Sequence, residues 1–386
     1  MMGFFQMVKR LMKEDTCVNL ISLLNFLPTI AGFSFQSEKF DVKFWIIHTF
    51  LYSYVHIVGT IVYQIYDADG FIDSINSFFN ISLCILICNC SWWLLYKRED
   101  LKELLYYVQQ NDDFVRESGR FLDKQIKLLH KIKLIILACY VFHFVDAVII
   151  YIPSRIMKLN DFSVATCVGL QPLTVSPNRE ICMGILAAQE LTAVLAVSSY
   201  DAILLFLFCH ITATFQLLYD DMMDFNHLAD EYEANSELES EVDARLKNLI
   251  IRHILTLKTV KKLQEIYNTA VGIGFGLNAI SMCLFFVLPI DVCLNFAPLI
   301  YHSFFVFFLY CYQGQRLTTA SERFEMSVYC CGWEKIQVKQ QKSILLMLMR
   351  AQKPVIIYAA GVVPIRLYTF ASTMQSIYKF VAVFKL

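Results

Sequence analysis

Charged residues are scarce in this chain of 386 residues. Asp, Glu, Lys and Arg make up 17% of it, whereas hydrophobic residues make up 57% and the mean hydropathy is positive. A soluble domain of this length carries more charge, because its surface must be solvated. The composition therefore excludes an ordinary soluble protein and predicts a single membrane domain over residues 1–386. The net charge of −1 gives no indication of a nucleic-acid partner.

Enzyme motifs are also missing from the sequence. We find no nucleophile beside a base, no glycine loop that would hold phosphates, and no cluster with metal-ligand spacing. Cysteines number 13, but Cys84, Cys88 and Cys90 are not spaced as in zinc or redox motifs. Cys167 lies in the loop between spans three and four and Cys182 at the far end of that loop, and the sequence leaves open whether they form a disulfide. We expect no enzyme activity, no cofactor, no metal site and no signal peptide.

Long apolar runs are present instead. A membrane-spanning helix needs roughly 20 apolar residues. Runs of this kind occupy Phe44–Tyr66, Ile75–Tyr96, Leu134–Pro153, Ile181–Tyr219, Ile266–Ile290, Val292–Gln313 and Val355–Phe384. The fourth run is too long for one crossing, so its helix should project into the cytoplasm. The sequence thus predicts an all-α protein with seven transmembrane helices.

The basic residues orient these spans. Lys and Arg favour the cytoplasmic side of short loops. With seven spans and a cytoplasmic N-terminus, 27 of the 33 basic residues fall in segments 1–43, 97–133, 219–262 and 314–354. We therefore predict a cytoplasmic N-terminus and an extracellular C-terminus. G-protein-coupled receptors have the opposite orientation, and their Asp-Arg-Tyr and Asn-Pro-x-x-Tyr motifs are also absent.

The cytoplasmic segments should contain helices of their own. Apolar residues at helical spacing between residues 100 and 131 predict extensions of spans two and three. The run Gln340–Gln352, which includes Leu346 and Leu348, is too apolar for a solvated helix. We expect it to pack against helices of its own chain or of neighbouring subunits. The acidic stretch 231–241 is expected to be disordered or loosely ordered.

Ionisable residues interrupt some of the predicted spans. They are His143, Asp146, Glu190, Asp201 and Arg366. Burying such groups in lipid costs several kcal/mol, so they either pair between helices or contact a ligand. We favour structural pairing. Asp146 lies three residues from His143, and the two share a helix face on which they could pair.

The C-terminal part carries a series of short motifs in a fixed order. They are Tyr310-Cys311, Gly314, Leu317, Ser321, Tyr329, Trp333, Arg350-Ala351-Gln352-Lys353-Pro354 and Ser376-Ile377-Tyr378. In this order they resemble the signature of the insect odorant receptor family, whereas the rest of the chain resembles it only in span pattern and length. The resemblance implies an odorant-gated, non-selective cation channel subunit in the plasma membrane of olfactory sensory neurons. The short loop between spans four and five is typical of a ligand-tuned member, which would form a heterotetramer with the shared co-receptor.

The resemblance also implies roles for the C-terminal segments. Residues 314–354 would form a cytoplasmic anchor in which Leu346 and Leu348 contact neighbouring subunits. Residues 355–386 would hold the last helix, and four copies of that helix would surround the ion path.

Alignment on Tyr378 places Val381 at the narrow outer gate and Phe384 one turn beyond it. A polar stripe on nearly the opposite face is the alternative lining of the ion path. It consists of Thr369, Ser372, Ser376 and Lys379. Lys379 in a narrow path would repel cations, so we prefer Val381.

In this family the ligand pocket is small, closed and apolar, and lies between the outer halves of spans two, three, four and six. Such a pocket binds volatile molecules by shape and dispersion. The expected lining residues are Ile75, Phe78, Phe79, Phe144, Ala147, Tyr151, Ala188, Leu191, Phe296, Leu299 and Tyr301. For any single aromatic, plain packing or an interfacial belt is the simpler explanation.

Two other classes of membrane protein are alternatives. Gustatory receptors end with Thr-Tyr, five apolar residues and Gln-Phe, and the stretch 377–385 lacks the Thr, the Gln and the final Phe. A secondary transporter would show inverted repeats and broken helices near the midplane, and neither is visible. The sequence does not specify which odorant binds.

Overall fold

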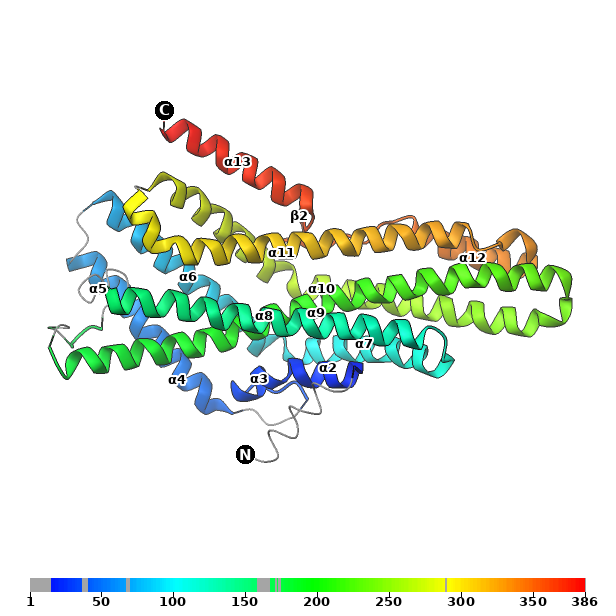
Figure 1. Ribbon diagram of the computed structural model, residues 1–386, viewed down its shortest axis with the longest axis horizontal. Coiled ribbons are helices and arrows are strands. Elements are labelled where there is room, and N and C mark those ends of the chain that lie inside the picture. The colour runs from blue at the N-terminus through cyan, green and yellow to red at the C-terminus, as the bar shows by residue number, and fades with distance from the viewer. Residues whose placement is uncertain are drawn as a thin grey trace.

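The computed structural model describes residues 15–36, 41–66, 70–157, 167–170, 172, 175–288 and 290–385, which form an elongated helical bundle (Figure 1). The helices are α2 (Cys17–Leu24), α3 (Phe26–Ile30), α4 (Val42–Tyr52), a π-helical turn (Ser53–Val58), α5 (Gly59–Tyr66), α6 (Phe71–Tyr96), α7 (Arg98–Ser118), α8 (Leu122–Met157), α9 (Asn178–Ala234), α10 (Glu239–Val287), α11 (Ile290–Tyr329), α12 (Val338–Ala351) and α13 (Leu367–Lys385). The 3₁₀ turns are Ser236–Leu238 and Trp333–Lys335, and two short strands, β1 (Tyr358–Ala359) and β2 (Val363–Pro364), form a hairpin. The prediction of an all-α fold is confirmed.

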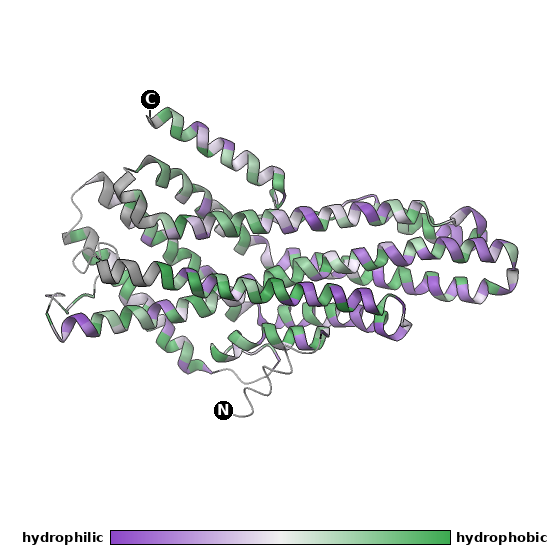
Figure 2. Cartoon of the chain, in the orientation of Figure 1, coloured by the Kyte–Doolittle hydropathy of each residue, from purple (hydrophilic) through white to green (hydrophobic). Residues whose placement is uncertain are grey.

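Within the described part, five helices are long and apolar enough to cross a membrane. They are Val42–Val62, Ser77–Tyr96, Leu122–Ile149, Asn178–Ala234 and Glu239–Phe286. Each contains or overlaps one of the first five predicted spans. The sixth predicted span lies in α11, and the last one includes α13. Apolar residues dominate one half of the bundle, and hydrophilic residues gather at the end formed by the α9–α10 turn (Figure 2).

Helix α9 is the centre of the bundle. The apolar run Ile181–Tyr219 is one uninterrupted helix that continues to Ala234, as the sequence predicted. Every residue from Ala202 to Phe208 is at most 1% exposed. A helix that is apolar on all sides is stable only when other helices surround it. Helices α8, α10 and α11 pack along it and supply that cover.

The α9–α10 connection corrects one expectation. The acidic stretch 231–241 is not loosely ordered, because α9 continues to Ala234 and α10 begins at Glu239. The turn is ordered by Asn235, whose side chain accepts a hydrogen bond from the Glu237 N–H at 3.1 Å. Nearby, Lys335 donates to Asp230, and this hydrogen bond raises the pKa of the Lys335 ammonium. Composition alone does not show such a local cap.

The segment before the last helix also differs from the prediction. A helix was expected from residue 355, but the chain first forms the β1–β2 hairpin, and α13 begins only at Leu367. Pro354 and Pro364 lack the N–H that a helix needs. Gly361 adopts a φ of 70° at the tip, a conformation that suits glycine. Arg366, which was expected inside the last span, precedes α13, and its carbonyl accepts from the Thr369 N–H at 3.0 Å.

The hairpin is held between α10 and α11. The Ala360 N–H donates to the Asn268 carbonyl of α10 at 2.8 Å. The Gln264 side chain binds both the N–H and the carbonyl of Tyr358, each at 2.7 Å. On the other side, Gly314 of α11 lies so close to Ile365 that a Cβ there would stand 2.1 Å from the Ile365 carbonyl oxygen. The hairpin therefore packs against α11 and leads directly into α13.

A disulfide joins Cys167 and Cys182. This is the pair that the sequence left open. The bond ties the loop after α8 to the first turns of α9.

Candidate functional site

A cavity of about 200 Å³ lies between α8, α9 and α11. Its walls are mainly apolar, and polar groups enter it from all three helices. The lining residues include Ile135, Ala138, Phe142, His143, Asp201, Leu205, Phe305, Leu309, Tyr310 and Gln313. An apolar cavity with a few polar groups has the usual construction of a small-molecule site.

Asp201 is the polar centre of this cavity. Its Oδ2 lies 2.7 Å from His143 Nε2, and its Oδ1 accepts a hydrogen bond from the Tyr310 hydroxyl. The other ring nitrogen of His143 lies 2.8 Å from the Cys139 carbonyl oxygen. Gln313 is buried, and its Oε1 has no hydrogen-bond partner among the described residues. The cavity thus contains one fully paired carboxylate and one amide oxygen that a ligand could bind.

Three of the ionisable residues in the spans, His143, Asp146 and Asp201, pair between helices, as we favoured. The particular pair proposed within span three is wrong: Asp146 contacts His302 of α11, with Asp146 Oδ2 and His302 Nδ1 2.9 Å apart. His143 contacts Asp201 of α9 instead. Asp146 and Asp201 each meet a histidine on a neighbouring helix, and spacing along one helix cannot show such a partner.

The expected pocket residues divide into two groups. Ile75, Phe79 and Leu299 come together in an apolar cluster with Leu288 and Ile300. The other expected residues are not members of that cluster. Phe78 contacts Phe79 edge to face, Phe144 packs on the main core, Ala147 is half-buried, Ala188 is exposed, and Leu191 and Tyr301 are 55% and 60% exposed. The side chains of Tyr151 and Phe296 lie outside the described residues.

Sequence reasoning missed the face of α8 that lines the cavity. It selected Phe144 and Ala147, whereas the cavity is lined by Phe142 and His143 of the same helix. Tyr301 touches this site only from outside, with its ring centroid 6.3 Å from that of Phe142. The available signal was the presence of ionisable residues in apolar runs, because they mark places where helices meet around polar groups.

The two C-terminal helices expose the surfaces that assembly and conduction would need. On α12, Leu346 is 65% exposed, whereas Leu348 packs on the core of its own chain. On α13, Val381 is half-buried against that core, and Ser372 and Ser376 on another face are exposed. The Phe384 side chain lies outside the described residues. Figure 1 shows α13 diverging from the bundle toward the C-terminus.

Comparison with known proteins places this arrangement in a family. The family model described as 7tm Odorant receptor matches residues 70–378. Odorant receptor 82a of Drosophila melanogaster is 25% identical over 190 residues, which are 48% of this chain and 47% of that protein. Odorant receptor 2a of the same species is 35% identical over 71 residues, or 18% of each chain. The chain thus matches less than half the length of these relatives.

The fold has a solved counterpart. The insect olfactory receptor OR5 from Machilis hrabei, determined in complex with eugenol, superposes with a TM-score of 0.73. The superposition covers 94% of this chain and 97% of that receptor, at 16% sequence identity. The structure of the same receptor solved without mention of a ligand gives a TM-score of 0.74. At this identity the likeness concerns the fold, and the family model carries the assignment: this multi-pass membrane protein belongs to the odorant receptor family.

Proposed function

We propose that the chain is the ligand-binding subunit of an odorant-gated, non-selective cation channel. It would assemble with co-receptor subunits as a heterotetramer in the plasma membrane of olfactory sensory neurons. The N-terminus would be cytoplasmic and the C-terminus extracellular, as the distribution of basic residues favours. Family membership, the fold and a cavity of suitable chemistry support this proposal.

The observation that carries the proposal is the cavity between α8, α9 and α11. Its volume of about 200 Å³ equals roughly six or seven water volumes, so a small volatile molecule fits. The apolar walls favour a hydrophobic ligand, and Gln313 Oε1 offers an acceptor for a ligand hydroxyl. We place the ligand here because this cavity combines apolar walls with polar groups, whereas Ile75, Phe79, Leu288 and Ile300 form a buried apolar cluster.

Ala138 marks the mouth of the cavity. It lines the cavity and is also exposed on the side of α8. This side belongs to a helix that is long and apolar enough to span a membrane. A hydrophobic ligand dissolved in the bilayer would reach the cavity through this opening.

The path from ligand to pore runs along α11. Phe305, Leu309 and Gln313 are among the α11 residues that line the cavity. The next residue after Gln313, Gly314, lies against Ile365 at the end of the hairpin. Helix α13 begins at Leu367, two residues after Ile365. A shift of α11 on ligand binding would therefore move the start of the proposed pore helix directly, through the contact between Gly314 and Ile365.

Assembly would use the exposed face of α12. Leu345, Leu346 and Met349 are each more than half exposed, although this part of the chain lies away from the apolar half of the bundle (Figure 2). Apolar side chains of this size in water favour contact with another surface. Leu348 is less suited to that role than the sequence indicated, because it packs within its own chain.

Closing the mouth of the cavity tests the ligand site. Ala138→Phe adds a ring at the opening, and because Ala138 is exposed, the change should leave the fold intact. Val141, which is 62% exposed on the same helix and absent from the cavity wall, gives the matched control Val141→Phe. Both variants are expressed with a co-receptor, and currents are recorded against the same odorant panel.

We expect Ala138→Phe to raise the odorant concentration for half-maximal current about tenfold or more, which corresponds to about 1.4 kcal/mol. Val141→Phe should respond like the unmodified chain. Ion selectivity should be unchanged in both, because the cavity is not the ion path. Equal odorant responses in Ala138→Phe and Val141→Phe, at equal surface expression, would refute this ligand site.

A further inference from the structure

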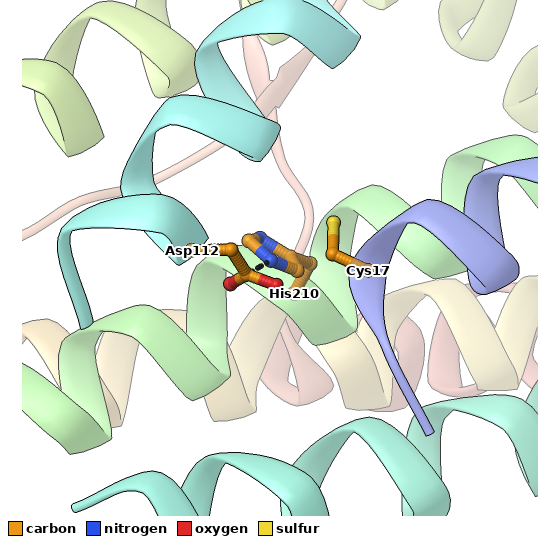
Figure 3. Close-up of side chains that lie close together, drawn as sticks. All are labelled: Cys17, Asp112 and His210. Carbon is orange, nitrogen blue, oxygen red and sulfur yellow. Dashed lines mark hydrogen bonds and ion pairs between the residues drawn. The ribbon is translucent and has the colours of Figure 1, made fainter. Parts of the chain in front are cut away.

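Three chemically active side chains from distant parts of the sequence meet away from the cavity. Cys17 is the first residue of α2, Asp112 lies on α7, and His210 lies on α9 (Figure 3). One ligand-type atom of each lies within 4.8 Å of the other two. His210 Nε2 and Asp112 Oδ1 are 3.0 Å apart. All three residues are at most 5% exposed.

The hydrogen bonds within this cluster leave it incomplete. The Cys17 thiol interacts with the Asp112 carboxylate, but Asp112 Oδ2 accepts no N–H or O–H hydrogen bond from the described residues. Cys17 is a free cysteine whose sulfur lies in the same small space. A buried carboxylate oxygen without a partner is costly. The unpartnered oxygen therefore indicates that a positively charged ligand belongs at this point.

We propose that Cys17, Asp112 and His210 bind a divalent zinc-type metal ion. A thiolate, an imidazole nitrogen and a carboxylate oxygen are the donors that zinc takes in proteins. In the tetrahedral geometry that zinc prefers, a water molecule or the second oxygen of Asp112 completes the set. On binding, the Cys17 thiol would release its proton to solvent. The proton on His210 Nε2 would move to Nδ1 by a change of tautomer, so that the Nε2 lone pair binds the metal in place of the hydrogen bond to Asp112.

A second cluster supports the choice by contrast. His143, Asp201 and His302 also gather three potential ligand atoms. There, however, both oxygens of Asp201 already have partners, His143 and Tyr310. In the cluster at Cys17, by contrast, Asp112 Oδ2 is available as a ligand. This cluster also contains a cysteine sulfur, and thiolates are ligands that select zinc.

The ion would connect the N-terminal helices to the centre of the bundle. Helix α2 has only eight residues, so a bond from its first residue to α7 and α9 fixes it strongly. His210 lies on α9 nine residues after Asp201, the polar centre of the cavity. Metal binding adds to the stability of the folded state, because the three ligands come together only on folding.

Cobalt spectroscopy tests the site directly, since Co²⁺ enters zinc sites and gives an absorption band when a thiolate binds it. The full chain is purified in detergent, together with partner subunits where it requires them, and titrated with Co²⁺. Cys17→Ser removes the proposed sulfur ligand. Cys209→Ser is the matched control, because Cys209 is also buried and lies next to His210 but is not part of the cluster.

We expect a thiolate–cobalt band in the unmodified chain and in Cys209→Ser, and its loss in Cys17→Ser and in His210→Gln. Adding Zn²⁺ should abolish the band and raise the melting temperature of the unmodified chain but not that of Cys17→Ser. Size-exclusion profiles identify any variant that fails to fold. Absence of the band in the folded, unmodified chain, or its persistence in Cys17→Ser, overturns the proposal without any measurement of channel activity.

Discussion

Gly314→Ala tests the contact through which we connect the cavity to the last helix. A Cβ at this position would lie 2.1 Å from the Ile365 carbonyl oxygen and 3.0 Å from the Ile365 carbonyl carbon. Side-chain carbons do not approach backbone oxygens so closely, so the hairpin must retreat by roughly 1 Å. Overpacking of this kind costs about 1–3 kcal/mol, and the displacement also moves the start of α13.

The control for this substitution is Gly276→Ala on α10. A Cβ at Gly276 meets no atom of the described residues within 4 Å. Alanine is favoured over glycine in a helix by about 0.8–1.0 kcal/mol. Gly276→Ala should therefore be neutral or slightly stabilising, whereas Gly314→Ala should lower the stability.

Thermal melting of the detergent-purified chain, followed by fluorescence-detected size exclusion, measures this difference. We expect Gly314→Ala to melt a few degrees below the unmodified chain. Each kcal/mol of lost stability lowers the melting temperature by about 2–4 °C in a chain of 150–250 residues, and by less in a longer one. Its odorant-evoked currents should fall, because α13 no longer follows α11. A Gly314→Ala variant that melts and conducts like Gly276→Ala would show that the close approach is unimportant.

Three further outcomes follow from the same structure. Replacing Leu345 and Leu346 by Asp should abolish tetramers on a native gel while leaving the monomer folded, because charge would be buried at the subunit contact. Tyr310→Phe removes a donor to a buried carboxylate without changing volume, and should cost about 1–3 kcal/mol in a thermal unfolding assay. On α13, Val381→Cys should be blocked by thiol reagents from outside and lose current if Val381 lines the gate. Modification of Ser376→Cys alone would assign the polar face to the pore.

Much of the fold follows from hydrophobic runs. The long fourth run predicted a single helix, and α9 is that helix, since an unbroken apolar sequence of this length has few other stable conformations. The short helix α12 was also predicted to within a few residues, from 340–352 in the sequence to Val338–Ala351 in the structure. The hairpin before α13 was missed, because its prolines and glycine occur within an otherwise apolar stretch. Short breaks of this kind are hidden when hydropathy is averaged over a window as long as a membrane span.

The candidate site was less predictable, since it depends on which faces of different helices meet. The sequence singled out His143 and Asp201 as notable but could not pair them, because they lie 58 positions apart. Cys17 and His210 were not recognised at all as neighbours of Asp112. Apolar lining residues are harder still, because Phe142 and Phe144 are chemically alike and only helix rotation decides which one faces the cavity.

Recording from cells that express this chain with a co-receptor tests the central proposal most directly. Volatile odorants should evoke a rapid current that Na⁺ and K⁺ carry about equally and that persists when G-protein signalling is blocked. The same current should need about tenfold more odorant, or more, when Ala138→Phe replaces the unmodified chain. The same odorant responses from the co-receptor alone, or a current that requires G-protein signalling, would contradict the assignment of this chain as an odorant-gated channel subunit.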